Sequence, residues 1–239
     1  MIIIPARIGS SRFPNKVLAD IGGIPMVIRT AKAVEDIDNV VIATDSQEVI
    51  AIASNHGIQA ILTSSKHQSG TDRIYEAAQK LDLDENEIVI NVQGDEPFIE
   101  TAVVWAVYNL TKKNKDDDRI MMNSCYKIIS NPEADDPNIV KVVTDSNSIA
   151  LYFSRAKIPY SRDHHFNTYK GHLGIYGFTV KSLRNFCMLN PAPLEEIEKL
   201  EQLRALYHSY SIAMTEVQTE SFGIDTVEDL EKAIKHHNL

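Results

Sequence analysis

The sequence predicts an α/β fold, a three-layer sandwich with a mostly parallel central sheet and an appended antiparallel hairpin. Short, β-branched and nearly continuous apolar runs lie at 2–4, 40–43, 58–62 and 88–92. Apolar residues that follow one another without alternation are typical of strands covered on both faces, as in a parallel sheet. Helical segments separate these runs, at 25–34, 47–54 and 71–81. This alternation indicates parallel strands joined by right-handed crossovers.

The pattern changes after residue 115. The charged stretch 112–118 is predicted to be a solvated loop, and strand-like segments follow at 121–129, 139–144 and 149–153. Residues 145–148 read Asp-Ser-Asn-Ser, which favours a turn and makes the last two segments an antiparallel hairpin. We therefore predict a single domain over 1–239, in which the region from about 120 to 180 is an appendage for sugar binding and dimerisation.

The rest of the chain predicts one more strand and two helices. A polar loop at 161–170 precedes a strand at 172–178. Apolar residues recur at every third position over 194–206, which predicts one helix with a single apolar face. A final helix carries Val227, Leu230 and Ile234.

Composition and charge limit the function classes. The chain has 239 residues, 24 Lys+Arg, 33 Asp+Glu and a net charge of -9. This length accommodates a sizeable core, and the acidic balance argues against non-specific binding to nucleic acid or to an anionic membrane. Cys125 and Cys187 form no metal-ligand spacing. The N-terminal apolar run is too short for a signal peptide or a membrane span, so we expect a cytoplasmic protein.

The loop after the first strand is the first candidate site. It runs from Pro5 to Lys16 and holds the cations Arg7, Arg12 and Lys16 together with Gly9. Ligands bind beyond the carboxyl ends of strands in open parallel sheets, and backbone N–H groups beside cations suit an anion. The spacing matches neither a P-loop nor a G-x-G-x-x-G dinucleotide loop. A solvated basic loop is the alternative.

Asp95 is a candidate metal ligand. It follows the apolar run 88–92, so it is expected to face the N-terminal loop. Mg²⁺ prefers carboxylate, water and phosphate oxygens as ligands. The alternative is an Asp that caps a turn before Pro97.

Six segments in chain order carry a resemblance to a known family. They are P-A-R-x-x-S-x-R-x-P-x-K at 5–16, H-Q-S-G-T-D-R at 67–73, N-V-Q-G-D-E-P at 91–97, L-Y-F-S-R-A at 151–156, H-L-G-I-Y-G at 172–177 and L-E-Q-L-R at 200–204. Together they are spread over nearly the whole chain. The sequence resembles the sugar nucleotidyltransferases, and among them the cytidylyltransferases that activate 3-deoxy-D-manno-octulosonate (Kdo).

The resemblance implies an enzyme that transfers CMP from CTP to Kdo and releases pyrophosphate, with Mg²⁺ as cofactor, for lipopolysaccharide biosynthesis. It implies a nucleotide site formed by Pro5, Ala6, Arg7, Ser10, Lys16, Ser69, Gly70, Arg73, Gln93 and Asp95. It implies a sugar site formed by Arg12, Gln93, Arg155, His172, Tyr176, Glu201 and Gln202. Catalysis would depend on Lys16, Asp95 and Asp225, with Asp95 and Asp225 as the metal ligands.

Other interpretations of these residues and of the function stay open. Asp225 before Thr226 is also a common start signal for a helix, and each sugar-site residue could be an ordinary core or surface side chain. Gly171 and Phe178 stand where the family usually carries Arg and Tyr. Because they flank the implied sugar site, sialic acid or an amino variant of Kdo is an alternative acceptor. A nucleotide-binding module without turnover is the non-enzymatic alternative.

The apolar hairpin at 139–153 also predicts self-association. Alternate residues of a strand point to opposite faces, and the main core covers only one of them. A second apolar face, and the resemblance to a dimeric family, therefore predict a homodimer. The alternative is that the helix predicted at 194–206 covers that face within one chain.

Overall fold

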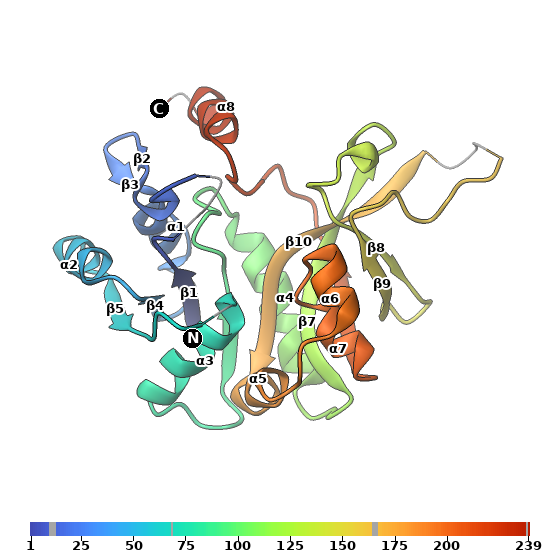
Figure 1. The fold of residues 1–239 in the computed structure, drawn as a ribbon, viewed down its shortest axis with the longest axis horizontal. Coiled ribbons are helices and arrows are strands. Elements are labelled where there is room, and N and C mark those ends of the chain that lie inside the picture. Colours follow the sequence, from blue (N-terminus) through green and yellow to red (C-terminus); the bar gives the residue numbers. More distant parts are fainter. Residues whose placement is uncertain (10–12, 68, 164–166, 238) are drawn as a thin grey trace.

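A nine-stranded sheet forms the centre of the described part of the molecule (Figure 1). The computed structural model describes residues 1–9, 13–67, 69–163, 167–237 and 239. The strands are β1 (Ile2–Ala6), β4 (Val40–Thr44), β5 (Gln59–Leu62), β6 (Ile88–Asn91), β7 (Ile120–Ser130), β8 (Lys141–Thr144), β9 (Ala150–Ser154), β10 (Thr168–Thr179) and β11 (Ser211–Glu216).

The strand order is β11-β7-β10-β6-β1-β4-β5. Outside this order, β8 pairs with both β10 and β9. Along that order β10 is antiparallel to both of its neighbours, and the other pairs are parallel. β1 lies between β4 and β6, with Ile2 opposite both Val40 and Ile90. The predicted α/β fold with a mostly parallel sheet is therefore confirmed.

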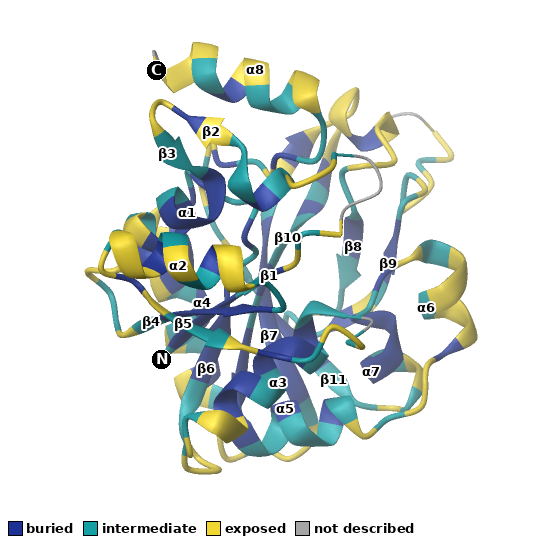
Figure 2. Cartoon of the chain, turned by 60° about the vertical axis from the view of Figure 1, so that its left-hand side comes forward, coloured by how far each residue is buried: buried dark blue, intermediate teal, exposed yellow. Residues whose placement is uncertain are grey.

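Helices cover both faces of the sheet and create three layers. On the face of Ile2 and Ile4 lie α1 (Met26–Val34), α2 (Gln47–Asn55) and α4 (Thr101–Asn114). On the face of Ile3 lie α3 (Gly70–Lys80), α5 (Val180–Cys187) and α7 (Leu203–Tyr207). The three isoleucines are at most 1% exposed, which explains why the first strand is continuously apolar. Figure 2 shows these buried strands beneath helices whose outer faces are exposed.

The remaining helices lie outside these two layers. They are α6 (Pro193–Glu198) and α8 (Val227–His237), with the short turns η1 (Lys16–Leu18) and η2 (Glu133–Asp135). α8 packs through Ala233 on a small cluster with Ile21 and Met26, near the two-stranded β2 (Asp20–Ile21) and β3 (Ile24–Pro25). Among the described residues, no helix is long and apolar enough to cross a membrane.

The predicted hairpin is formed by β8 and β9. The two strands are antiparallel, with Val142 opposite Phe153. Asp145 Oδ1 accepts hydrogen bonds from the backbone N–H groups of Asn147 and Ile149, both at 2.8 Å, which closes the turn. The following strand, β10, begins at Thr168, so the polar loop is shorter than predicted and the strand is longer.

The single helix predicted over 194–206 is wrong. The segment forms α6 and α7, and Lys199 between them has the left-handed φ of 54°. Each step of three residues falls about 60° short of a full turn, so a strict three-residue period does not stay on one helix face. Ile197 is accordingly 77% exposed, whereas Leu203 is fully buried.

Other local predictions also need correction. The stretch 112–118 is not entirely a loop, because α4 continues to Asn114. The helices α4 and α5 and the edge strand β11 were not predicted. β11 pairs in parallel with β7, a contact between segments about ninety positions apart that no local pattern indicates.

Gly177 of β10 lies where a side chain has no room. A Cβ there would lie 2.0 Å from Thr111 Oγ1 and 3.1 Å from Ile90 Cδ1. Overpacking a core costs about 1–3 kcal/mol, so Gly177→Ala should lower the free energy of unfolding by about that amount. Urea unfolding measures it. In the control Gly174→Ala, the nearest atom to the added Cβ is Gln93 Cγ at 3.8 Å, and an equal loss in both variants would contradict the prediction.

Candidate functional site

A cavity of about 330 Å³ lies at the carboxyl ends of β1 and β6. The predicted residues that line it are Pro5, Ala6, Arg7, Lys16, Ser69, Gly70, Arg73, Gln93, Asp95 and Asp225. The structure thus brings together residues from four distant parts of the chain, as a ligand site at this edge of the sheet requires. Two further predicted residues, Ser10 and Arg12, lie outside the described residues.

Lys16, Asp95 and Asp225 meet at the wall of this cavity. Lys16 Nζ lies 2.6 Å from Asp95 Oδ2 and 2.9 Å from Asp225 Oδ1. Burial lowers the pKa of Lys16, but the charges and hydrogen bonds of the two carboxylates outweigh burial and raise that pKa above its ordinary value. Lys16 is therefore an ammonium ion that bridges two carboxylates.

Asp225 is not the residue that caps α8. Asp229 N donates to Thr226 Oγ1 at 3.1 Å, and Thr226 N donates to Asp229 Oδ2 at 3.1 Å, so Thr226 starts the helix. Ile224 N donates to Asp95 O at 2.9 Å, which ties this segment to the loop after β6. The Asp225 carboxylate faces Lys16, as the metal-ligand hypothesis needs.

The Asp95 carboxylate likewise points into the site. The backbone closes the turn after β6 by itself, because Glu96 N donates to Gln93 O at 3.1 Å. Asp95 and Asp225 could hold a divalent metal, and carboxylate oxygens suit Mg²⁺. Among the described residues, no group of three or more metal-ligating side chains occurs. A Mg²⁺ ion here would therefore need further oxygen ligands from phosphate and water.

The N-terminus of α3 forms another wall. Asp72 N donates to Ser69 Oγ at 3.0 Å, so Ser69 is the N-cap. Gly70 begins the helix, and a Cβ there would lie 3.3 Å from Pro5 Cγ, so a side chain would crowd the facing loop. Gln93 lies between this wall and β10, since its atoms are 3.8 Å from the Cβ positions of both Gly70 and Gly174. That placement fits its predicted role toward both substrates.

Arg73 lines the cavity, but protein contacts fix its guanidinium. The Arg73 side chain is 3% exposed, Nη1 donates to Thr63 Oγ1 at 2.6 Å, and Nη2 pairs with Asp45 at 2.8 Å. Arg73 thereby joins α3 to the loops after β4 and β5. Its predicted contact with the base or phosphate stays a prediction.

His67 lines the same cavity and was not predicted as a site residue. Its Nε2 pairs with the Glu76 carboxylate, which also binds Lys80 at 2.8 Å and accepts from Ser64 N at 2.9 Å. Burial raises the pKa of Glu76, but the hydrogen bonds from these partners outweigh burial and lower the pKa to about 2. The signal in the sequence was only the position of His67 within the 67–73 segment.

His172, Tyr176 and Glu201 form a half-buried polar cluster. The rings of His172 and Tyr176 have centroids 5.5 Å apart. Burial lowers the pKa of His172 to about 3, so this imidazole is neutral at pH 7. Burial raises the pKa of Glu201 to about 7, and the nearby Ser69 and Thr71 side chains oppose that rise only in part. Since Ser69 is the N-cap of α3, this cluster lies next to the α3 wall of the cavity.

Two buried polar atoms lie in this region. Glu201 Oε1 and Gln202 Nε2 have no hydrogen-bond partner among the described residues. Gln202 is 3% exposed, and a buried polar atom without a partner costs free energy. Hydroxyl groups of a ligand could satisfy both atoms, which fits the predicted sugar site.

Arg155 is held by the backbone instead of facing the cavity. Its Nε donates to Glu198 O at 2.8 Å and its Nη1 donates to Pro137 O at 3.0 Å. Arg155 O in turn accepts from the buried Lys141 Nζ at 2.7 Å. Arg155 therefore joins the hairpin to α6, and its predicted contact with a sugar stays a prediction.

The two departures from the family pattern lie in packed regions. A Cβ on Gly171 would lie 2.8 Å from Ile129 Cγ2, so a larger side chain does not fit this packing. Phe178 is fully buried, with its ring centroid 6.3 Å from that of Phe186. Both differences are therefore accommodated by the protein core.

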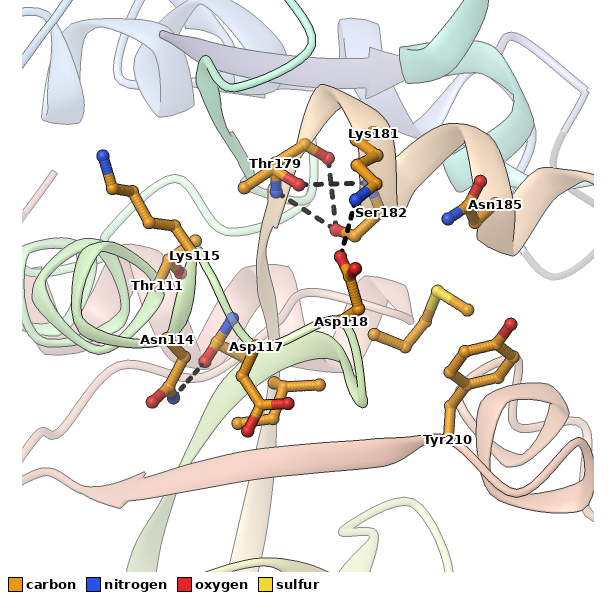
Figure 3. Close-up of a pocket in the computed structure, with 13 residues that line it drawn as sticks. Thr111, Asn114, Lys115, Asp117, Asp118, Thr179, Lys181, Ser182, Asn185 and Tyr210 are labelled. Atoms are coloured by element: carbon orange, nitrogen blue, oxygen red, sulfur yellow. Dashed lines mark hydrogen bonds and ion pairs between the residues drawn. The ribbon is translucent and has the colours of Figure 1, made fainter.

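A second polar pocket lies at the opposite end of the sheet, between α4, β7 and α5 (Figure 3). Its volume is about 20 Å³, which suits little more than a water molecule. Its polar groups bind one another: Lys181 Nζ donates to Asp118 Oδ1 at 2.7 Å, and Asn114 Nδ2 donates to Asn123 Oδ1 at 2.8 Å. The larger cavity is therefore the candidate site.

Residues 1–214 match the protein family described as cytidylyltransferase. The chain belongs to this family. A 3-deoxy-manno-octulosonate cytidylyltransferase of a Nitratiruptor species is 58% identical over 232 residues and covers 97% of both chains. A second, from Wolinella succinogenes, is 54% identical over 239 residues and covers 98% of both chains. The predicted resemblance is thus confirmed.

Solved structures agree with this cytidylyltransferase assignment. A CMP:2-keto-3-deoxy-manno-octonic acid synthetase complexed with CTP matches with a TM-score of 0.89 at 38% identity, over 100% of this chain and 98% of that one. A 4-diphosphocytidyl-2C-methyl-D-erythritol synthase of Anaerococcus prevotii has a TM-score of 0.60 at 13% identity, over 100% and 98% of the chains. That second likeness concerns the fold alone.

Glu201 should make stability depend on pH. Its folded-state pKa of about 7 exceeds the ordinary 4.5, so the folded state binds more protons between these values and stability falls as pH rises through that window. The shift corresponds to a loss of about 3 kcal/mol in the free energy of unfolding above pH 7. Glu201→Gln should therefore stabilise the protein relative to wild type at pH 8 and not at pH 4.5.

Urea unfolding of both proteins at several pH values measures this difference. The comparison isolates Glu201, because Glu96, whose pKa burial and Asp95 raise to about 8, is present in both proteins. A constant difference between wild type and Glu201→Gln from pH 4.5 to 8 would contradict the raised pKa.

Proposed function

We propose that this protein transfers CMP from CTP to Kdo and releases pyrophosphate. The observation that carries the proposal is the bridge from Lys16 to Asp95 and Asp225 inside a cavity at the carboxyl edge of the sheet. The relatives named above as 3-deoxy-manno-octulosonate cytidylyltransferases, and the synthetase solved with CTP, support this substrate pair. No observation favours sialic acid, an amino variant of Kdo or a binding module without turnover.

The cavity residues have distinct roles in binding the triphosphate and in catalysis. Arg7 and Lys16 supply positive charge for the triphosphate, and the N–H groups at the start of α3 add donors near Gly70. The anomeric hydroxyl of the sugar attacks the α-phosphorus in line and pyrophosphate leaves, without a covalent enzyme intermediate. The protein contributes mainly by positioning the reactants and neutralising charge.

Asp95 and Asp225 are the residues that would hold Mg²⁺. Their carboxylates already converge on one cation, the Lys16 ammonium, which fits a metal position between them. Mg²⁺ bound there would neutralise phosphate charge and polarise the reacting phosphoryl group. The carboxylates themselves fix where that positive charge lies relative to the triphosphate.

The acceptor side is suited to an anionic polyol. His172 is neutral. Gln202 Nε2 has no hydrogen-bond partner in the described part of the chain and could donate to a sugar oxygen. Glu201 Oε1 could accept from a hydroxyl. We further infer that CMP-Kdo made here supplies lipopolysaccharide biosynthesis, and that the reaction takes place in the cytoplasm.

We also propose that the protein is a homodimer through the hairpin region. α7 packs on one side of the hairpin, where Val142 and Phe153 are buried with Leu203, so that side is covered within the chain. Leu151 of β9 is nevertheless 61% exposed. An exposed leucine in this apolar hairpin suits burial against a second copy.

Pyrophosphate release tests the proposed reaction. With CTP and Mg²⁺ present, we expect rapid release with Kdo and much slower release with sialic acid or without an acceptor. Faster release with sialic acid than with Kdo would show that sialic acid is the acceptor. Nucleotide binding without any release of pyrophosphate would show that the protein is a binding module and not an enzyme.

The variant Asp95→Asn extends this test to the metal ligand. An amide keeps the shape but removes the charge, so turnover should fall by on the order of 100-fold or more. Asp118→Asn, in the distant small pocket, is the matched control and should leave turnover unchanged. Normal activity and normal Mg²⁺ dependence of Asp95→Asn would show that Asp95 is not a ligand.

Light scattering tests the assembly. We expect wild type to have the mass of two chains at micromolar concentration, and Leu151→Asp to have the mass of one chain, because a buried charge opposes association. Asn147→Asp adds the same charge at the exposed hairpin turn and should stay dimeric. A monomeric wild type, or a dimeric Leu151→Asp, would refute this interface.

A further inference from the structure

The geometry points to Lys16 as an internal cation that occupies the metal position until the nucleotide arrives. In the nucleotide-free protein the Lys16 ammonium holds Asp95 and Asp225 together, and a divalent ion enters between them when the triphosphate draws Lys16 away. This inference rests on the proposed function, and it goes further by assigning the order in which nucleotide and metal assemble. It makes Lys16 a positioning residue for the metal ligands as well as a contact for the triphosphate.

The bridge is specific in its geometry. One nitrogen lies within hydrogen-bond distance of oxygens from two carboxylates, at 2.6 and 2.9 Å. The Lys16 side chain is only 12% exposed, whereas those of Asp95 and Asp225 are 28% and 43% exposed. The ammonium therefore lies deeper in the protein than the carboxylates that it joins.

The three segments are each fixed by other contacts. Lys16 begins the η1 turn, where Leu18 N donates to Asn15 O at 2.8 Å. Asp95 and Asp225 belong to segments joined by the hydrogen bond from Ile224 N to Asp95 O. The backbone thus holds the two carboxylates near each other, and their mutual repulsion favours a positive charge between them.

Competition between Lys16 and a metal follows from this arrangement. A divalent ion that approaches the free protein must displace a bound ammonium and would gain only two carboxylate ligands among the described side chains. A bound triphosphate changes both conditions, because its oxygens attract the ammonium and also supply ligands to the metal. Nucleotide and metal should therefore bind with positive coupling, and each should strengthen the other to the same degree.

Metal binding to the nucleotide-free protein tests the inference without turnover. Mn²⁺ is the probe, and electron paramagnetic resonance counts the free ion during a titration. Lys16→Met keeps the length of the side chain and removes the charge. We expect this variant to bind Mn²⁺ at least about tenfold more tightly than wild type, a difference of about 1.4 kcal/mol.

Lys127→Met is the matched control. Lys127 Nζ donates to Ser221 O at 3.1 Å, and its charge acts on the neighbouring Glu96. No hydrogen bond or ion pair with Asp95 or Asp225 is recorded for it among the described residues. Its removal should change Mn²⁺ affinity by less than about threefold. Equal Mn²⁺ affinities in wild type, Lys127→Met and Lys16→Met, or equal gains in the two variants, would overturn the inference.

Two further measurements keep the test decisive if Lys16→Met does not fold. Lys16→Gln retains a hydrogen-bond donor for the carboxylates and should gain affinity in the same direction. Wild-type crystals without nucleotide, soaked in Mn²⁺, should give no anomalous peak between Asp95 and Asp225. A peak there with Lys16 still in place would show that the ammonium does not exclude the metal.

The outcomes separate this inference from the proposed reaction. If wild type releases pyrophosphate with Kdo but Lys16→Met gains no Mn²⁺ affinity, the proposed reaction is supported and the role of Lys16 at the metal position is refuted. A gain in Mn²⁺ affinity in a protein that is inactive with every acceptor would support the role of Lys16 and refute the reaction.

Discussion

The parallel pairing of β1 with β4 and β6 is the constraint on which the site depends. Because these strands run in one direction, the loop that starts at Pro5 and the loop that carries Asp95 emerge at the same edge of the sheet. The hydrogen bond from Ile224 N to Asp95 O brings a third segment, from the end of the chain, to that edge. The Lys16 bridge to two carboxylates is possible only because all three segments converge there.

The parts of the fold that the sequence predicts well are those whose signal is local. β1 and β6 are covered on both faces, so their residues are continuously apolar and stand out from the segments around them. The prediction of one helix over 194–206 is wrong because a period of three residues does not stay on one helix face, and Lys199 adopts a left-handed conformation that ends α6. β11 was missed because its place is set by pairing with the distant β7.

The candidate site was predicted by the same logic, with similar gaps. Residue types and their position after strands indicated Lys16 and Asp95, and the family resemblance added Asp225. The contacts of Arg73 with Asp45 and Thr63, and those of Arg155 with backbone carbonyls, depend on tertiary packing that motif spacing does not encode. The same is true of His67, whose orientation follows from Glu76 on the next helix.

Charge is distributed unevenly across the site, and this follows from burial. The cavity wall holds full charges, with Lys16 between two carboxylates that are partly exposed. Around His172 and Glu201, burial keeps the imidazole neutral and raises the pKa of the carboxyl group to about 7, so fixed charge is reduced there. In the proposed reaction an anionic sugar meets an anionic triphosphate. Such an arrangement would favour it, because the sugar would be bound through hydrogen bonds while cations would lie near the phosphates, where negative charge develops.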